Sequence, residues 1–582
     1  MSDPNSSFRN RLTALLRQIY PDHDADALAQ GIVAAFWPDG AAMRRRGRVP
    51  GNRQWSERDA MVITYGNSIV DGAHKPLDLL RHFLHRHLAG VVNGVHILPF
   101  FPYTSDDGFA VSDYRAVNPV LGDWADIRRI GSEFLLMSDL VLNHVSSQSN
   151  WFNDYLQGHE PYDKFFFEAT PEDDLSDVVR PRTHPLLREV ETARGVRHVW
   201  CTFSHDQVDL DFRNPEVLME FLRVTRLHVD NGVRILRLDA VAFLWKEIGT
   251  RSIHMPQTHA IVRLMRLLAD FAAEPLILLT ETNVPNAENL SYFGNRNEAH
   301  AVYNFSLPPL VLHAMLSGSA RGLIRWQGGM PPAQLGCAYL NFTASHDGIG
   351  MRPAEGILSP ADTARVIGAV RDFGGRVSMR ALPGGGEAPY ELNITWFEAM
   401  KGTFDGPAPD TWIERFLTSQ TLVMALEGIP AFYIHSLLAT PNDEDGVEKT
   451  GHNRAINRHR WEYDRLQMLL ADPETPQHQV LEEMKRRIEI RRRQRAFHPN
   501  ATQFTLQLDD RIFGLWRQSL DRDQSIFALH NVSDSAVEIE PWQINLIAGE
   551  VWQDLLSGEM IDPDGPPIHF APYQCRWITN RG

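Results

Sequence analysis

Three acidic residues each follow an apolar run typical of a buried strand: Asp239 ends VRILRLD, Glu281 follows PLILLT, and Asp347 follows YLNFTASH. Such a carboxylate must reach solvent or a partner, because burying an unpaired charge is costly. Arg237 lies two residues before Asp239, on the same face of a strand. We expect Arg237 to keep Asp239 ionised with a low pKa, which suits a nucleophile. The apolar run beside Glu281 should raise its pKa, which suits a general acid.

Each of these residues also has an ordinary structural interpretation. Arg237 and Asp239 could form a structural ion pair, Glu281 could cap the next helix, and Asp347 could form an Asx turn into the following glycine. Together, however, the three carboxyl groups supply the parts of a retaining glycosidase-type mechanism. One attacks the anomeric carbon, a second protonates the leaving oxygen, and a third binds sugar hydroxyls and stabilises the oxocarbenium-like state.

The elements that must position these residues are short apolar runs that alternate with longer helical patterns from Met61 onward. This alternation predicts parallel strands joined by helices. Several of the runs end in ionisable residues, and a (β/α)8 barrel places its active site at the C-terminal ends of its strands. We therefore predict an α/β fold: a (β/α)8 TIM barrel with a subdomain inserted after strand 3 and a small C-terminal antiparallel β domain.

The predicted domain boundaries follow changes in sequence pattern. Residues 1–56 form an N-terminal helical extension, and residues 57–498 form the catalytic barrel. Two irregular stretches are too long for ordinary connections. They predict an inserted subdomain at about 146–230 and an acceptor-loop insert at about 373–395. Short alternating strands then predict the C-terminal β domain at 499–582.

Four segments, in order, resemble the signature segments of the α-amylase family, glycoside hydrolase family 13: DLVLNH (139–144), VRILRLDAV (233–241), LLTETN (278–283) and ASHD (344–347). The resemblance covers nearly the whole chain from about residue 58 to residue 580. It implies that Asp239 is the nucleophile, Glu281 the acid/base and Asp347 the transition-state stabiliser. It also implies that three further residues contact the sugar or orient those carboxyl groups: His144, Arg237 and His346.

Longer segments such as SDDGFAVSDYRAVNPVLGDW and GVEKTGHNRAINRH resemble the sucrose phosphorylase subfamily, in which phosphate intercepts a glucosyl-enzyme. This resemblance implies a donor pocket built from Asp106, Phe109, Phe203 and Arg458. It also implies that Arg182 serves the acceptor or phosphate. Three positions depart from that subfamily and put fructose in doubt as the acceptor: Asn283 replaces a histidine, Phe243 replaces a tyrosine, and Ala388-Pro389-Tyr390-Glu391 replaces Asp-Leu-Tyr-Gln.

The segments ETNVP, PYELN and RAINR and the N-terminal extension look most like the glucosylglycerate phosphorylase branch. That resemblance implies the substrate 2-O-(α-D-glucopyranosyl)-D-glycerate, whose leaving group carries a carboxylate. A cationic acceptor subsite would suit this charge. The residues expected there, for acceptor or phosphate, are Arg182, Asn283, Tyr390, Glu391, Arg376 and Arg380, although the last two could equally be solvent-exposed loop charges. Alternatives are a sucrose phosphorylase, a glucosylglycerol phosphorylase, an α-glucoside hydrolase, or a barrel that has lost catalysis and serves only in binding.

Composition restricts the possible partners. The net charge is −16, which disfavours nucleic acid as a partner. No apolar run is long enough to span a membrane. His82, His85 and His87 do not converge on one helix face, so we expect no metal and no cofactor. Three scattered cysteines suit a cytoplasmic protein. We expect a monomer or homodimer that binds only a small α-glucoside and inorganic phosphate.

Overall fold

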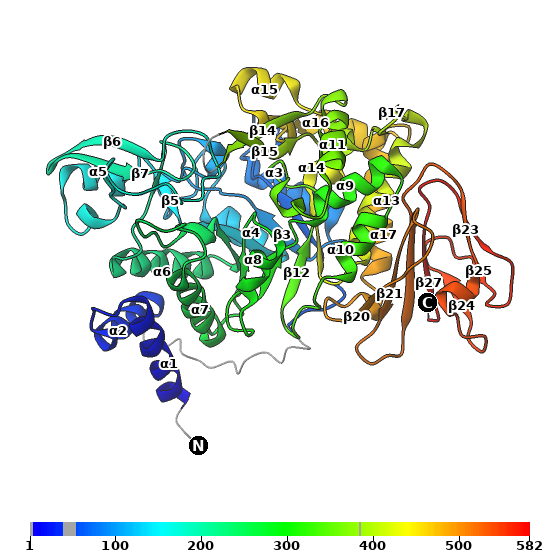
Figure 1. The fold of residues 1–582 in the computed structure, drawn as a ribbon, viewed down its shortest axis with the longest axis horizontal. Helices are drawn as coiled ribbons and strands as arrows, with labels where there is room; N and C mark the ends of the chain where they lie inside the picture. The colour runs from blue at the N-terminus through cyan, green and yellow to red at the C-terminus, as the bar shows by residue number, and fades with distance from the viewer. Residues whose placement is uncertain (1–3, 39–53, 383–385, 582) are drawn as a thin grey trace.

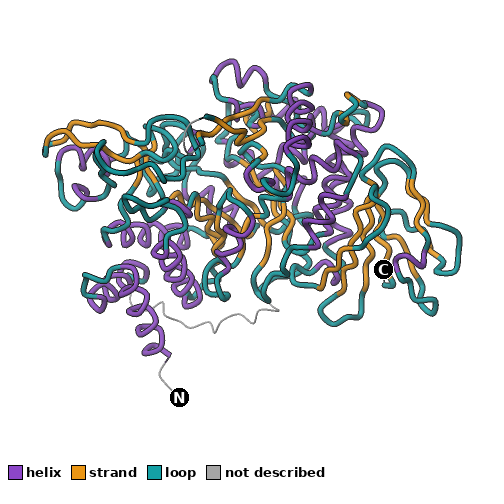
Figure 2. The backbone as a smooth tube through the Cα atoms, viewed as in Figure 1, coloured by secondary structure: helices purple, strands orange, loops and turns teal. Residues whose placement is uncertain are grey.

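Eight parallel strands form a closed barrel at the centre of the computed structural model, which describes residues 4–38, 54–382 and 386–581 (Figures 1 and 2). In chain order the barrel strands are β1 (Met61–Thr64), β3 (Gly94–Ile97), β4 (Leu135–Val141), β9 (Val233–Asp239), β10 (Ile277–Thr280), β11 (Ala301–Tyr303), β12 (Ala338–Asn341) and β18 (Ile429–Tyr433). Nearly all of their residues are buried, as expected for strands covered by helices. The predicted TIM barrel is confirmed.

Helices cover the outside of the barrel: α3 (Pro76–Phe83), α4 (Trp124–Glu133), α6 (Pro215–Asp230), α7 (Pro256–Phe271), α9 (Leu307–Ser317), α10 (Arg321–Gly328), α11 (Pro360–Asp372), α13 (Trp412–Ala425) and α17 (Pro476–Arg491). Several begin with a proline, whose fixed φ suits the first helical turn. Polar N-cap side chains, such as that of Asn214 before α6 and Ser359 before α11, accept hydrogen bonds from the first free amides.

The insertion after β4, the third barrel strand, contains β5 (His144–Ser146), α5 (Asn150–Gln157), β6 (Leu187–Thr192), β7 (Gly195–Trp200) and β8 (Gln207–Asp209). Strands β5 and β8 pair antiparallel, which places His144 opposite Asp209 at the barrel mouth. Residues 215–230, the last part of the predicted insert, form α6, the regular helix that leads into β9.

A second excursion follows β12 and forms a small antiparallel sheet in the order β13 (Ile349–Gly350), β15 (Glu387–Asn393), β14 (Arg376–Ala381). Strand β15 lies in the middle of this sheet and β14 lies on its outer side. The hairpin of β14 and β15 occupies most of the predicted acceptor-loop insert at 373–395. Residues 383–385, at its tip, lie outside the described residues.

The chain ends in a six-stranded antiparallel sheet, as predicted: β20 (Thr502–Thr505), β21 (Ile512–Gln518), β22 (Ser525–Asn531), β27 (Cys575–Thr579), β24 (Trp552–Asp554) and β25 (Met560–Ile561). The fully buried Arg517 of β21 donates hydrogen bonds to the carbonyl oxygens of Ala425 and His498, at 2.7 and 2.9 Å. These bonds join the sheet to α13 and to the chain that leaves the barrel.

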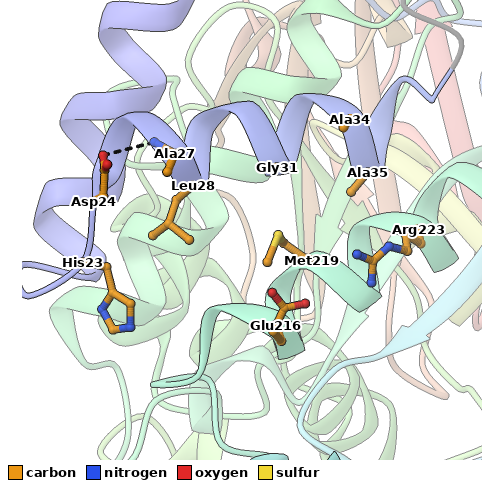
Figure 3. Close-up of a pocket in the computed structure, with 10 residues that line it drawn as sticks. All are labelled: His23, Asp24, Ala27, Leu28, Gly31, Ala34, Ala35, Glu216, Met219 and Arg223. Atoms are coloured by element: carbon orange, nitrogen blue, oxygen red, sulfur yellow. Dashed lines mark hydrogen bonds between the residues drawn. The ribbon is translucent and has the colours of Figure 1, made fainter. Parts of the chain in front are cut away.

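Two N-terminal helices, α1 (Pro4–Ile19) and α2 (Ala25–Phe36), pack against α7 and α6 at the lower left of Figure 1. The ring of Phe8 lies 4.8 Å from that of Phe271, centroid to centroid. A surface cleft separates α2 from α6, with Leu28 on one side and Met219 on the other (Figure 3). The rest of the predicted extension, at 39–53, lies outside the described residues. No helix among the described residues is long and apolar enough to cross a bilayer.

Candidate active site

One cavity at the C-terminal ends of the barrel strands gathers most of the predicted site residues. It lies between the insertion after β4 and the sheet of β13–β15. Thirteen of the predicted residues line it: Asp106, Phe109, His144, Arg182, Phe203, Arg237, Asp239, Glu281, Asn283, His346, Asp347, Tyr390 and Glu391. Its volume is about 60 Å³, well below the ~300 Å³ or more of typical ligand sites, so side chains must move when a sugar binds.

The parallel register of the strands brings the acids together. Asp139 of β4 pairs with Arg237 of β9, and Asp239, at the end of β9, neighbours Glu281 just beyond β10. The Arg237 guanidinium contacts Asp139, lies 2.7 Å from Asp239 Oδ1, and lies 4.0 Å from Glu281 Oε1. The next residue, Ala240, has a φ of +49°, and its N–H donates to Glu281 Oε2 at 3.0 Å. This turn fixes the two carboxyl groups on one side of the cavity.

Burial raises the pKa of both Asp239 and Glu281, and in each case Arg237 opposes the rise. The expected low pKa of Asp239 is therefore wrong, because desolvation outweighs the guanidinium. The two groups titrate as a pair. Since Arg237 contacts Asp239 directly and lies farther from Glu281, we assign the negative charge to Asp239 and the proton to Glu281. This is the charge state that attack and protonation require.

Another part of the cavity wall combines aromatic rings with polar groups. The ring of Phe109 stacks on the imidazole of His346, with centroids 4.8 Å apart and planes within 5°. His144 Nε2 lies 3.0 Å from the Phe109 carbonyl oxygen, and the Gln207 side-chain amide donates to Asp106 Oδ2 at 3.3 Å. A flat apolar surface edged by hydroxyl-binding groups suits one sugar ring.

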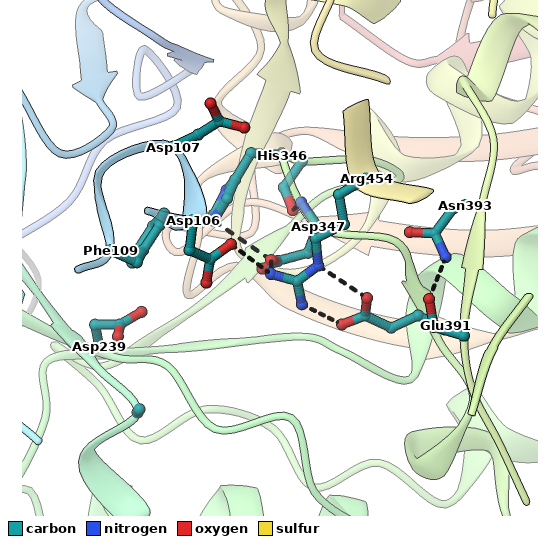
Figure 4. Close-up of polar contacts among 12 residues, drawn as sticks. Asp106, Asp107, Phe109, Asp239, His346, Asp347, Glu391, Asn393 and Arg454 are labelled. Atoms are coloured by element: carbon teal, nitrogen blue, oxygen red, sulfur yellow. Dashed lines mark hydrogen bonds and ion pairs between the residues drawn. The ribbon is translucent and has the colours of Figure 1, made fainter. Parts of the chain in front are cut away.

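Arg454 is the main residue that the sequence analysis missed. Its guanidinium lies 2.8 Å from Asp347 Oδ1 and holds Glu391 through two contacts of 2.5 and 3.0 Å (Figure 4). It comes from η9 (Asn453–Asn457), a 3₁₀ helix that follows α15 (Glu444–Thr450). Burial acts to raise the pKa of Asp347, but Arg454 and then His346 outweigh it, so the net effect is a lowered pKa. Glu391, expected in the acceptor site, is thus occupied in binding Arg454.

Arg458 does not line the cavity but positions a residue that does. Its Nε donates to the His346 carbonyl oxygen at 2.9 Å, and its Nη1 lies 2.6 Å from Asp107 Oδ2. Asp106 and Asp107 both have positive φ, 53° and 46°, a conformation that is uncommon for residues with a side chain. The Arg458 contact stabilises this turn and thereby directs Asp106 into the cavity.

The acceptor side is only partly as expected. Arg182 lies over the rings of Tyr390 and Phe203, at 5.1 and 5.8 Å from their centroids. Arg376 and Arg380 do not line the cavity, because they belong to the outer strand β14. Their partners are Glu444 and Glu355, at 2.8 and 2.9 Å.

Comparison with known proteins places these features in a family. A model of the α-amylase catalytic domain matches residues 76–327. A glucosylglycerate phosphorylase of Spirochaeta thermophila is 44% identical over 551 residues, which cover 92% of this chain and 93% of that protein. The Escherichia coli glucosylglycerate phosphorylase is 38% identical, over 90% of this chain and 92% of its own length. The chain belongs to the α-amylase family, glycoside hydrolase family 13.

A solved crystal structure of a similar protein has the same fold. The crystal structure of sucrose 6F-phosphate phosphorylase from Thermoanaerobacter thermosaccharolyticum matches with a TM-score of 0.70 at 25% identity. The match covers 82% of this chain and 94% of that one. The α-amylase family resemblance given by the four segments is thereby confirmed along most of the chain. Among the described residues, no cluster of three or more potential metal ligands occurs in this family member.

The sequence analysis also missed two residues that contact and position lining side chains of this α-amylase family site. Asp139 is fully buried and accepts from both Arg237 and His96, the latter at 2.6 Å. Gln207 contacts both Asp106 and His144. Asp139 begins the quoted segment DLVLNH, so a charged residue inside an apolar strand was the available signal. Gln207 sits in the irregular insertion and carried no comparable signal.

Replacing Glu281 by glutamine tests the assigned proton donor. We expect kcat/KM to fall by about 10²- to 10⁴-fold for glycosides with alkoxide leaving groups, because the amide cannot supply a proton. α-Glucosyl fluoride needs little protonation and should lose much less. The basic limb of the pH–rate profile, set by deprotonation of Glu281, should disappear. An equal loss on both substrates would contradict the assignment.

Proposed function

We propose that the protein is a retaining phosphorylase that converts 2-O-(α-D-glucopyranosyl)-D-glycerate and phosphate into α-D-glucose 1-phosphate and D-glycerate. The observation that carries this proposal is the 38–44% identity, over about nine-tenths of the chain, to proteins named glucosylglycerate phosphorylase. The cavity also supports the proposal, because the neighbouring carboxyl groups of Asp239 and Glu281 and the guanidinium-bearing Arg182 all line it. Sucrose phosphorylases are similar at 28–29% identity.

The first half of the reaction cleaves the glycosidic bond. Asp239 attacks C1 of the glucosyl unit while Glu281 transfers its proton to the departing glycerate oxygen. The C1–O bond breaks as a bond from C1 to a carboxylate oxygen of Asp239 forms. Asp347 binds glucose hydroxyls and stabilises the positive charge that develops on the ring. The product is a β-glucosyl-enzyme.

The second half transfers the glucosyl group to phosphate. A phosphate oxygen attacks C1 from the face that the glycerate left, and Glu281, now ionised, accepts the phosphate proton. The bond to Asp239 breaks, so two inversions give the α configuration. Arg182, whose guanidinium is bound to no carboxylate among the described residues, is available to bind the phosphate.

An acceptor screen in the synthetic direction tests the proposed function. The enzyme is incubated with glucose 1-phosphate and one of D-glycerate, fructose, fructose 6-phosphate or glycerol, and phosphate release is measured. We expect D-glycerate to give the highest rate. A preference for fructose would identify a sucrose phosphorylase, a preference for glycerol a glucosylglycerol phosphorylase, and release without any acceptor a hydrolase.

The same proposal places the enzyme in the cytoplasm as a monomer or homodimer, with no cofactor. Its three cysteines, Cys201, Cys337 and Cys575, are buried at separate places in the fold, which suits a reducing compartment. The substrate and phosphate are its only expected partners.

A further inference from the structure

The cavity is rich in acid, which makes an anionic acceptor hard to bind. Five carboxyl groups line it: Asp106, Asp239, Glu281, Asp347 and Glu391. Two of the three lining arginines are already paired, Arg237 with Asp139 and Asp239, and Arg454 with Asp347 and Glu391. Two anions, phosphate and glycerate, must nevertheless use this site in the proposed reaction. They bind one after the other, and Arg182 is the one lining arginine without a carboxylate partner among the described residues, so it would have to serve both.

A second cation with an unused donor, Arg352, lies near the acceptor side of the cavity. Arg352 opens η7 (Arg352–Ala354), directly after β13. No carboxylate lies within ion-pair distance of its guanidinium among the described residues, and its Nε is buried without a hydrogen-bond partner. Burial lowers its pKa, and Tyr390, Arg380 and Glu355 are among the charged or titratable groups that act on it. A buried donor without a partner is destabilising, so an anion that accepts from it would be stabilising.

The backbone places Arg352 next to two lining residues. The preceding residue, Met351, donates its N–H to the Tyr390 carbonyl oxygen at 2.9 Å. Gly350 lies so close to Asn283 that a Cβ at this position would come within 2.7 Å of Asn283 Oδ1. This Oδ1 is itself buried without a partner, and Asn283 is one of the residues that line the cavity. An unused acceptor of a lining residue, Asn283 Oδ1, and an unused cationic donor, Arg352 Nε, thus belong to neighbouring segments, although Arg352 itself does not line the cavity.

This pair of unused groups matches a hydroxy acid. A hydroxyl can donate to Asn283 Oδ1 while the adjacent carboxylate accepts from the Arg352 guanidinium. Phosphate fits less well, because in the proposed reaction its proton goes to Glu281, and Arg182, over the Tyr390 ring, is already available to bind it. A neutral polyol would satisfy Asn283 and leave Arg352 unpaired.

We propose that Arg352 binds the carboxylate of the acceptor acid and selects a 2-hydroxy acid over a neutral polyol of the same size, with Asn283 binding the acid's hydroxyl. This inference rests on the proposed function and names the residue that determines its acceptor specificity. Arg352 belongs to the acceptor subsite, so its loss acts on acceptor binding and leaves formation of the glucosyl-enzyme from glucose 1-phosphate intact.

The test compares Arg352→Gln and Arg352→Lys with the matched control Arg376→Gln, which removes a surface arginine bound to Glu444. Three rates are measured with glucose 1-phosphate: transfer to D-glycerate, exchange of labelled phosphate, and hydrolysis. For Arg352→Gln we expect kcat/KM for D-glycerate to fall about 10- to 100-fold, mainly through KM, with exchange and hydrolysis unchanged. Lysine should restore part of the loss, and the control should behave as the wild type.

The outcomes separate this inference from the proposed function. A wild-type enzyme that transfers no glucose to D-glycerate overturns the proposed function. A wild-type enzyme that does so, with Arg352→Gln unchanged, overturns only the role of Arg352. Phosphate exchange that falls as much as glycerate transfer makes Arg352 a phosphate ligand and also overturns the inference. Hydrolysis that falls equally assigns it a structural role, with the same consequence.

Discussion

Asp239→Ala will lower kcat for phosphorolysis by roughly 10⁴-fold or more, because no other group can form the covalent bond to C1. Asp239 lies 2.7 Å from Arg237 and is nearly fully buried. Its removal leaves Arg237 paired with Asp139, so the barrel should fold and melt much as the wild type does. Steady-state kinetics of glucose 1-phosphate formation from the glucoside and phosphate, together with a thermal melt, measure both effects.

A small external nucleophile distinguishes loss of the nucleophile from loss of structure. Azide can occupy the space that the side chain vacates and attack C1 from the same face. We expect β-glucosyl azide to accumulate when the Asp239→Ala enzyme is given azide and α-glucosyl fluoride, a substrate with a good leaving group. Residual phosphorolysis above about one per cent of the wild-type rate would refute the role of Asp239 as nucleophile.

Arg454→Ala will lower kcat/KM by about 10²-fold or more, whatever the acceptor. The substitution leaves Glu391 buried without its partner and takes from Asp347 the cation that does most to hold its pKa down. The pKa of Asp347 then rises. Because Asp347 is needed as an anion, the acid limb of the pH–rate profile should move to higher pH. Kinetics over a range of pH with two different acceptors measure this shift.

Two variants serve as controls for Arg454. Arg454→Lys keeps the charge but not the forked contact with Glu391, so an intermediate activity is expected. Arg376→Ala breaks an exposed ion pair worth about 0–1 kcal/mol and should change little. If Arg454→Ala lost activity without a shift of the acid limb, Arg454 would have only a packing role.

The sequence predicted a residue's position in the site correctly where that position follows from the strand that carries the residue. Asp239 and Glu281 each end an apolar strand, and parallel strands of a barrel share one C-terminal edge. Their proximity therefore follows from the fold class alone. The α-amylase family resemblance then named the same residues independently. The local charge balance could not be predicted in this way, because the pKa of Asp239 depends on whether its burial or the Arg237 guanidinium has the larger effect.

Contacts between distant loops were beyond the sequence analysis. Arg454 and Glu391 are 63 positions apart and come from two different excursions of the barrel, so neither marks the other as its partner. Arg376 and Arg380 carried the expected charge but lie on the outer strand β14, while β15 faces the cavity. Arg352 was overlooked because only its unused buried donor distinguishes it from a surface arginine.

Sequence patterns were enough to predict the barrel, the inserted subdomain, the C-terminal sheet and the three carboxyl groups that meet in the cavity. Each of these depends on periodicity or on residues next to a strand end, and both are local properties. Which arginines lack a carboxylate partner became clear from the three-dimensional contacts alone, since pairing depends on side chains that meet across loops distant in the chain. We propose that two such arginines, Arg182 and Arg352, bind the anionic substrates.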